Sequence, residues 1–284
     1  MNEERDSDAI AGLPEGSVLY ISAVVAAHHP LHGGFRRNAE PPPDIDLTRI
    51  VASAGEWVRR YFAPGVIDGT RGAAAFPDRL DGYRGLVVGG SLHTCLLEDR
   101  ELEPWQSDLV ELIRAAVFEA KLPFLGLCGG GQLGLVALGG KVRSNPAGLA
   151  GPGSPAGALL VRTGVMRLTA EGRADPIFKG CPAEVPMLES HKEWLAELPA
   201  GARVLADSDD LPQQVIAWGD HVRLFQPHPE LTVEYVRRLL EEMAPEMSDP
   251  EPVMRAVAKL TPTPVANRRI VKNFLSEFCA TRPA

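Results

Sequence analysis

The chain alternates short apolar runs with longer segments of helical spacing. Residues 18–25, 85–88 and 122–127 are short, apolar and mostly bounded by glycine or proline, which is typical of buried strands. Between the last two runs, residues 105–120 place apolar side chains three and four positions apart, which predicts an amphipathic helix. Strands separated by helices predict βαβ units, in a parallel sheet with helices on both faces.

The same pattern predicts the remaining elements. Helices are expected at 46–62, with Asp46 as a cap, at 132–138, at 233–243 and at 265–279, where an apolar face would dock the helix. Residues 158–168 and 204–218 predict an antiparallel β portion. Residues 143–157 are rich in Gly and Pro and predict a loop, which we expect beside the candidate catalytic site at Cys128. We therefore expect a doubly wound, mostly parallel α/β sheet with a small antiparallel extension. One domain would span residues 1–284, with a core at about 16–243 and a connection and docking helix at 244–284.

Composition narrows the class of protein. Hydrophobic residues make up 45% of the chain, which is enough for a full core. A formal net charge of −8 argues against nucleic acid as a partner. The acidic, polar start is unlike a secretory signal, and no apolar run reaches membrane-spanning length. The four cysteines are far apart in sequence, so we expect neither disulfides nor a zinc site, and a reducing cytoplasmic location.

Candidate chemistry begins at Cys128, where the apolar run 122–127 ends and three glycines follow. A strand that turns sharply into a helix has this pattern, and the glycines would let the turn hold the cysteine in a strained, exposed position. The positive end of the next helix would favour the reactive thiolate. A turn that cradles a phosphate, or an inert buried cysteine, fits the same residues.

A second segment, residues 222–230, ends in Gln-Pro-His-Pro-Glu. His228 lies between two prolines, which fix φ and restrict the residue before them, so the ring would be held rigidly. Glu230 could hold the far ring nitrogen and support an imidazolium. Taken alone, the segment fits a solvated surface turn better, but together with Cys128 it favours nucleophilic catalysis.

The two segments resemble those of the class I glutamine amidotransferases, which use a Cys-His-Glu set. Residues 126–132 match the Gly-x-Cys-x-Gly-x-Gln elbow of that family, and residues 226–230 match its Gln-x-His-Pro-Glu segment. Residues 85–91, 138–148 and 189–202 resemble further stretches of it. The resemblance runs from about residue 18 to residue 279 and is to the stand-alone, GMP-synthase-like branch, which includes γ-glutamyl peptidases. It implies a flavodoxin-like fold.

The resemblance also implies roles for individual residues. Cys128 would attack the substrate carbonyl, His228 would move the proton, and Glu230 would orient the ring. Backbone amides of Gly90 and Gly129 would form the oxyanion hole. The implied substrate-binding residues are Gly89, Gln132, Ser190, His191 and Lys192. No metal or cofactor is implied.

One other cluster invites a metal interpretation. The histidines at positions 28, 29 and 32 lie close together, but in a Pro- and Gly-rich insertion and without a carboxylate at ligand spacing. We therefore expect no metal there, and the role of the insertion at 28–43 stays open.

Three functions are compatible with these residues. The first is a glutaminase that cleaves the γ-amide of glutamine through a γ-glutamyl thioester and releases ammonia for a separate synthetase, since the chain lacks an ATP-binding Walker loop. The second is a self-sufficient γ-glutamyl hydrolase or peptidase. The third is an inactive binding or regulatory module on the same fold. Gly129 and Gly131 stand where many relatives have larger side chains, which suggests room for a substrate larger than glutamine.

Overall fold

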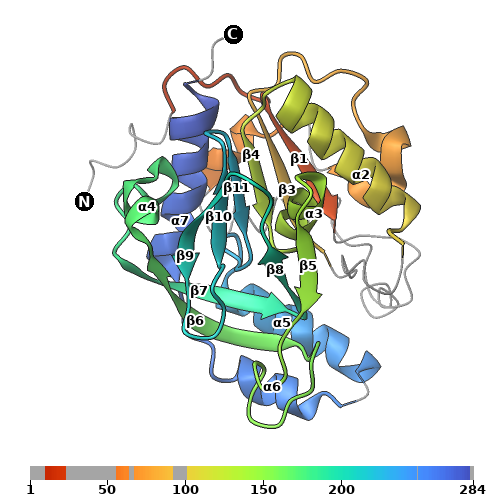
Figure 1. Ribbon diagram of the computed structural model, residues 1–284, viewed down its shortest axis with the longest axis vertical. Helices are drawn as coiled ribbons and strands as arrows, with labels where there is room; N and C mark the ends of the chain where they lie inside the picture. Colours follow the sequence, from red (N-terminus) through yellow and green to blue (C-terminus); the bar gives the residue numbers. More distant parts are fainter. Residues whose placement is uncertain (1–9, 24–55, 64–66, 92–100, 248, 282–284) are drawn as a thin grey trace.

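The computed structural model describes residues 10–23, 56–63, 67–91, 101–247 and 249–281. A nine-stranded sheet in the order β2-β1-β3-β4-β11-β10-β9-β6-β7 runs through it, and a two-stranded sheet pairs β5 with β8 (Figure 1). The strands are β1 Val18–Ala23, β2 Ile67–Asp68, β3 Gly85–Ser91, β4 Phe124–Leu127, β5 Lys141–Ser144, β6 Leu160–Leu168, β7 Glu184–His191, β8 Glu193–Glu197, β9 Ala202–Asp207, β10 Val215–Trp218 and β11 Val222–Phe225. The helices are α2 Pro104–Arg114, α3 Gly129–Ala137, α4 Ala170–Ala174, α5 Val233–Met243, α6 Glu251–Val257 and α7 Pro264–Asn273.

The large sheet has two halves of different character. From β2 to β11 every neighbouring pair is parallel. From β11 through β10, β9 and β6 to β7 every pair is antiparallel. The parallel half confirms the expected doubly wound α/β fold. The antiparallel part belongs to the same sheet, and β7 forms its edge.

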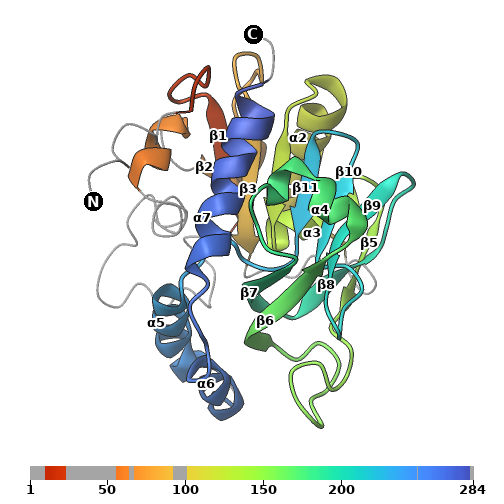
Figure 2. The same ribbon diagram turned by 90° about the vertical axis from the view of Figure 1, so that its left-hand side faces the viewer.

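Alternation along the parallel strands explains why both faces are covered. In β1, Val18 and Tyr20 pack into one core with the C-terminal residues Phe274 and Phe278, whereas Leu19 and Ile21 pack into another core with the residues of α2 and α3. Two views at right angles place α7 and α2 on either side of these strands (Figures 1 and 2). Because successive side chains point to opposite faces, strands covered on both sides must be apolar throughout.

A third, smaller core lies under the antiparallel half. Residues of α5 and α6, among them Val236 and Val257, pack against Val161 of β6 and Leu188 of β7. Figure 2 shows this helix pair to one side of β6 and β7, and Figure 1 shows α6 below them. The pair covers the strand that, as described below, borders the candidate site.

Local signals explain several of the element boundaries. Pro104 occupies the first turn of α2, and the side chains of Glu103 and Gln106 cap each other's backbone amides. The helix continues as a π-helical turn over Ala115–Glu119, so the amphipathic stretch predicted at 105–120 is confirmed. The C-terminal prediction is confirmed in the same way, since α7 continues as a π-helical turn over Phe274–Cys279.

Other expectations are corrected. The stretch at 244–252, expected to be a connection without helix, contains the start of α6 at Glu251. Residues 143 and 144, expected in a loop, belong to β5. Of the helix expected at 46–62, residues 46–55 lie outside the described residues, and Glu56–Tyr61 forms a short 3₁₀ helix.

Two general properties concern the described part of the chain. None of its helices is both long enough and apolar enough to cross a lipid bilayer. Within the same residues, no three His, Cys, Asp or Glu side chains are grouped as metal ligands would be. The histidines at 28–32, the insertion at 28–43 and Cys95 lie outside the described residues. The other three cysteines are free thiols.

Candidate functional site

Topology brings the sequence-predicted catalytic residues to one edge of the sheet. The strands β3, β4 and β11 are parallel neighbours, so their carboxyl ends lie together. Gly89 and Gly90 are at the end of β3, Cys128 follows β4, and His228 comes three residues after β11. This edge is where open α/β sheets bind their ligands.

Cys128 sits on a strained turn between β4 and α3. Its φ of 48° and ψ of −108° are unfavourable for any residue with a Cβ, so the surrounding structure must impose them. The turn is tight because Gly126 lies against the next turn of chain, and a Cβ there would be 2.6 Å from the carbonyl oxygen of Gly130. The cysteine occupies the N-cap position of α3, at the positive end of the helix.

The thiol is not exposed, contrary to expectation. Cys128 is 5% exposed, and its Sγ is 3.8 Å from the backbone oxygen of Ser190 and 3.8 Å from Nε2 of Gln226. Gln226 is itself fully buried. The turn strains the cysteine as predicted, but β7 and the segment after β11 cover it.

His228 is held from both sides. Its Nδ1 is 2.6 Å from Oε1 of Glu230, and its backbone amide donates to the carbonyl of Leu188 in β7 at 2.8 Å. Both His228 and Glu230 are buried. Because the Glu230 carboxylate accepts a hydrogen bond from Nδ1, that nitrogen carries a proton. Nε2 is then the ring nitrogen that faces the other neighbours of His228.

Electrostatics favour the protonated form of His228. Burial alone would lower its pKa, but the negative charges of Glu230 and Cys128 and hydrogen bonds with both raise the pKa to about 10. At neutral pH the site therefore holds an imidazolium next to sulfur, which is the charge arrangement of an activated cysteine.

Ser190 and Gly90 complete the surroundings of this pair. The carbonyl oxygen of Ser190 is 3.4 Å from His228 Nε2 as well as 3.8 Å from Cys128 Sγ. On the other side, a Cβ on Gly90 would lie 3.1 Å from Cε1 of His228 and 3.9 Å from Cβ of Cys128. Gly90 thus borders both catalytic candidates through backbone alone.

The glycines after Cys128 do not leave empty space beside the sulfur. A Cβ on Gly129 would lie 2.4 Å from Cβ and 2.5 Å from the amide nitrogen of Ser91. On Gly130 it would lie 2.2 Å from the carbonyl oxygen of Val88, and on Gly131 2.7 Å from that of Phe225. The first turn of α3 is therefore pressed onto β3 and β11. The interpretation that these glycines make room for a larger substrate is corrected, because backbone fills that room.

The implied substrate-binding residues lie in different settings. Gln132 is buried and donates from Nε2 to the carbonyl of Glu193 at 3.0 Å, which ties α3 to β8. His191 is buried, with Nδ1 3.0 Å from Oδ1 of Asn145. Lys192 is exposed. Of this set, Ser190 approaches the sulfur with its carbonyl oxygen at 3.8 Å, and Gly89 precedes Gly90 in β3. Contact of all five with substrate stays a prediction.

Sequence reasoning missed the network behind Ser190. Glu189 is 3% exposed and accepts from Nε of Arg162 at 3.0 Å and from Nε2 of Gln214 at 3.2 Å. Burial would raise the pKa of Glu189, but His191 and Arg162 outweigh it and hold the pKa below its usual value. The signal was a carboxylate that directly follows the apolar run 185–188, but the partners of Glu189 are distant in sequence.

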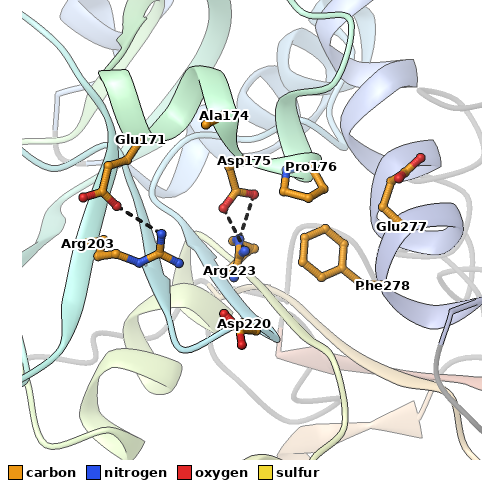
Figure 3. Close-up of a pocket in the computed structure, with 9 residues that line it drawn as sticks. All are labelled: Glu171, Ala174, Asp175, Pro176, Arg203, Asp220, Arg223, Glu277 and Phe278. Atoms are coloured by element: carbon orange, nitrogen blue, oxygen red, sulfur yellow. Dashed lines mark hydrogen bonds and ion pairs between the residues drawn. The ribbon is translucent and has the colours of Figure 1, made fainter.

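A cavity of about 480 Å³ lies elsewhere, around the start of β11 (Figure 3). Its charged wall includes Arg223, whose Nη2 is 2.7 Å from Oδ2 of Asp175, and Arg203, whose Nη1 is 3.0 Å from Oε2 of Glu171. None of its lining residues belongs to the Cys128 site. Both arginines are paired with carboxylates, and no cysteine, serine or histidine is among the residues that line the hollow.

Comparisons with known proteins point to one family. Residues 103–241, just under half of the chain, match the model of the family described as Glutamine amidotransferase class-I. Gamma-glutamyl peptidase 3 of Arabidopsis thaliana is 27% identical over 80% of this chain and 86% of its own length. A glutamine-hydrolyzing GMP synthase of Streptococcus uberis is 36% identical over 40% of this chain but only 20% of its own length.

Solved structures agree on the fold. A glutamine amidotransferase from Thermotoga maritima superposes with a TM-score of 0.63 at 14% identity, covering 94% of this chain and 99% of that one. Another, from Methylobacillus flagellatus, gives a TM-score of 0.63 at 18% identity, covering 95% and 97%. At such identities the likeness concerns the fold.

Proposed function

We propose that this chain, whose residues 103–241 match the class I glutamine amidotransferase family, is a cysteine-dependent hydrolase of γ-glutamyl amides. One observation carries the proposal. Cys128 stands on a strained turn beside a buried imidazole that Glu230 holds at 2.6 Å. A buried cysteine that serves only packing needs neither the strain nor the charge partners.

The first half of the reaction forms a thioester. The Cys128 thiolate attacks the carbonyl carbon of the γ-amide, and the carbonyl oxygen becomes an oxyanion. We assign its donors to the backbone amides of Gly90 and Gly129, which flank the sulfur from β3 and from the start of α3. The C–N bond then breaks, and the departing nitrogen takes the proton from Nε2 of His228.

The second half restores the enzyme. Water attacks the γ-glutamyl thioester and gives one proton to the now neutral His228. The C–S bond breaks, glutamate leaves, and sulfur returns as the thiolate beside the imidazolium. Glu230 keeps Nδ1 protonated throughout, so that Nε2 is the nitrogen that exchanges protons.

Two substrates share this mechanism. Relatives that match along most of their own length are named as γ-glutamyl peptidases, which favours a self-sufficient enzyme that acts on an amide larger than glutamine. The GMP synthases match over a fifth of their length, which favours a glutaminase that supplies ammonia to a separate synthetase. We favour the γ-glutamyl peptidase, because the peptidase of Arabidopsis thaliana matches 80% of this chain and the GMP synthase of Streptococcus uberis only 40%.

The test is a direct assay of the purified chain. Release of glutamate is measured from L-glutamine and from a series of γ-glutamyl dipeptides, with the Cys128→Ala variant as control. A rapid acid quench followed by peptide mass analysis then looks for a γ-glutamyl adduct on Cys128.

Each outcome has a meaning. Faster cleavage of dipeptides supports the peptidase, and cleavage of glutamine alone supports the glutaminase. Turnover of neither, with no adduct on the sulfur, would overturn the proposal and leave an inactive module on this fold.

A further inference from the structure

The carbonyl of Ser190 is a shared acceptor for the catalytic proton. Its oxygen lies 3.8 Å from Cys128 Sγ and 3.4 Å from His228 Nε2. A carbonyl can only accept, so it faces the S–H of the thiol form and the Nε2–H of the ion-pair form alike. The position of the Ser190 oxygen therefore affects both the orientation and the stability of the His228 imidazolium.

The peptide that carries this oxygen lies at a corner of the fold. Ser190 and His191 end β7, the edge strand of the large sheet, and Glu193 begins β8 in the small one. Only Lys192 separates the two strands. A strand end at the edge of a sheet has ladder bonds on one side only, so other groups must fix its last peptides.

Asn145 occupies this corner and makes five hydrogen bonds there. Its side-chain Nδ2 donates to the carbonyl of His191 at 2.7 Å and to that of Ala158 at 3.1 Å, and its Oδ1 is 3.0 Å from His191 Nδ1. Its backbone amide donates to the carbonyl of Lys192 at 2.8 Å, and its own carbonyl accepts from Gly157 at 2.9 Å. It is 1% exposed.

These bonds also set the state of the His191 ring. Because the Asn145 nitrogen is used by two carbonyls, its oxygen faces His191, and Nδ1 of the ring must donate. Burial lowers the pKa of His191, and the positive charges of His228 and Arg162 lower it further, against the carboxylate of Glu189. Nδ1 therefore carries a proton, and Nε2 lies 3.6 Å from Oε2 of Glu189, the carboxylate whose pKa His191 helps to hold down.

We propose that Asn145 is a positioning residue of the reaction: by clamping His191 and Lys192, it holds the Ser190 carbonyl against the Cys128–His228 pair. This proposal rests on the proposed hydrolase function. The clamp acts through the end of β7, and no hydrogen bond of Asn145 reaches the Cys128 sulfur or the His228 ring. Without it, the end of β7 loses two side-chain hydrogen bonds and the imidazolium loses a fixed acceptor.

A matched control exists in the same chain. Asn273, in α7, is also buried, and its Nδ2 donates to the carbonyls of Ile177 and Lys179, each at 2.9 Å. Asn273→Ala removes the same chemical group on the opposite face of the sheet from α3, with two side-chain hydrogen bonds lost against three in Asn145→Ala. Asn145→Ala should therefore lose somewhat more stability, and it alone should alter the site.

Two readouts are compared between wild type, Asn145→Ala and Asn273→Ala. The first is kcat on the substrate found for the wild type, which should fall about 10²-fold in Asn145→Ala, as misplacement of about 1 Å does. The second is alkylation of Cys128 by iodoacetamide as a function of pH, mapped by peptide mass. Its midpoint should move to higher pH in Asn145→Ala, because the imidazolium beside the sulfur is less stable.

The alkylation profile separates this proposal from the one it rests on. If the wild type hydrolyses no amide, the proposed function fails, while the profile still reports on the clamp. If Asn145→Ala matches Asn273→Ala within about twofold in kcat and in its profile, the positioning role is wrong although the hydrolase stands.

A second variant covers the case in which Asn145→Ala does not fold. Asn145→Asp keeps the volume and the acceptor for His191 Nδ1 but loses both donors, and Asn273→Asp is its control. The same fall in kcat and the same shift are expected in Asn145→Asp, and their absence contradicts the proposal.

Discussion

Two buried ion pairs stand near opposite ends of β11, and only one of them is suited to chemistry. Arg223, inside the strand, holds Asp175 through two bonds, Nε to Oδ1 at 3.0 Å and Nη2 to Oδ2 at 2.7 Å, with the ring of Phe278 4.8 Å from its guanidinium carbon. His228, just beyond the strand, is held by Glu230 through one bond, which leaves Nε2 to face Ser190 and the sulfur.

The contrast separates a structural pair from a catalytic one. An arginine keeps its proton at any working pH and presents fixed donors, so the first pair can hold elements together but cannot exchange protons. An imidazole can, and its pair sits against a strained cysteine. A cavity of about 480 Å³ lies beside the arginine (Figure 3), so the presence of a hollow does not by itself identify the end of the strand that carries the chemistry.

Replacing the nucleophile is expected to have the largest effect. Cys128→Ala should lower kcat by on the order of 10⁵-fold or more, because no thioester can form. The melting temperature should stay close to that of the wild type, since the turn already forces a residue with a Cβ into the same strained conformation. Steady-state kinetics and a thermal melt test this. Full turnover in Cys128→Ala would show that the Cys128–His228 pair is not catalytic.

Removing the charge of Glu230 is next. Glu230→Gln should lower kcat by on the order of 10²–10⁴-fold, as loss of the orienting carboxylate does in related triads. It should also lower the pKa of His228 from about 10, so the alkaline limb of the pH–rate profile should move to lower pH. An unchanged limb would mean that Glu230 does not control the ring.

The same pKa makes a statement about stability. The folded-state pKa of His228 lies above its ordinary value of 6.5, so its protonation stabilises the fold. That contribution is fully present below about pH 6.5 and is lost as the pH rises toward 10. Chemical denaturation of Glu230→Gln should therefore show a weaker loss of stability over this range than the wild type.

Breaking the arginine pair should give the opposite signature. Arg223→Met leaves the Asp175 carboxylate buried without its cation, which should cost about 3–5 kcal/mol in the free energy of unfolding. The kcat of the folded fraction should not change, because none of the bonds that join the pair involves Cys128 or His228.

The same cavity supplies the control. Arg203→Met breaks an exposed pair with Glu171 and should cost at most about 1 kcal/mol. Urea denaturation with parallel kinetics checks both variants. A fall in kcat in fully folded Arg223→Met would mean that the Arg223–Asp175 pair contributes to catalysis and is not purely structural.

How much the sequence predicts differs between the halves of the sheet. Apolar runs and helical spacing located β1, β3, β4, α2, α5 and α7, since strands covered on both faces must be apolar and amphipathic helices have a fixed period. The short strands β5 and β8 were not predicted, because four or five residues that pair only with each other carry little pattern.

The candidate site divides in the same way. Cys128, His228 and Glu230 stand out because glycines and prolines mark their turns, and the strand order then brings those turns together. The partners of Glu189 and the corner held by Asn145 depend on contacts across 25 to 46 positions, and no local signal announces them. The burial of Cys128 under β7 was missed for the same reason.

A substitution in the first turn of α3 tests the correction about the glycines. In Gly129→Ala the new methyl group would meet Ser91 at 2.4–2.5 Å, including its backbone nitrogen, so α3 or β3 must shift. We expect kcat to fall about 10-fold to 10²-fold, and equally for glutamine and for larger γ-glutamyl amides, because the shift moves the sulfur rather than narrowing a pocket. Ratios of kcat/KM across a series of amides of increasing size measure this. If kcat/KM falls only for the larger amides, the methyl group projects into the substrate pocket and Gly129 determines specificity. If kcat/KM falls equally for all amides, position 129 requires glycine because the backbones of α3 and β3 are in contact there.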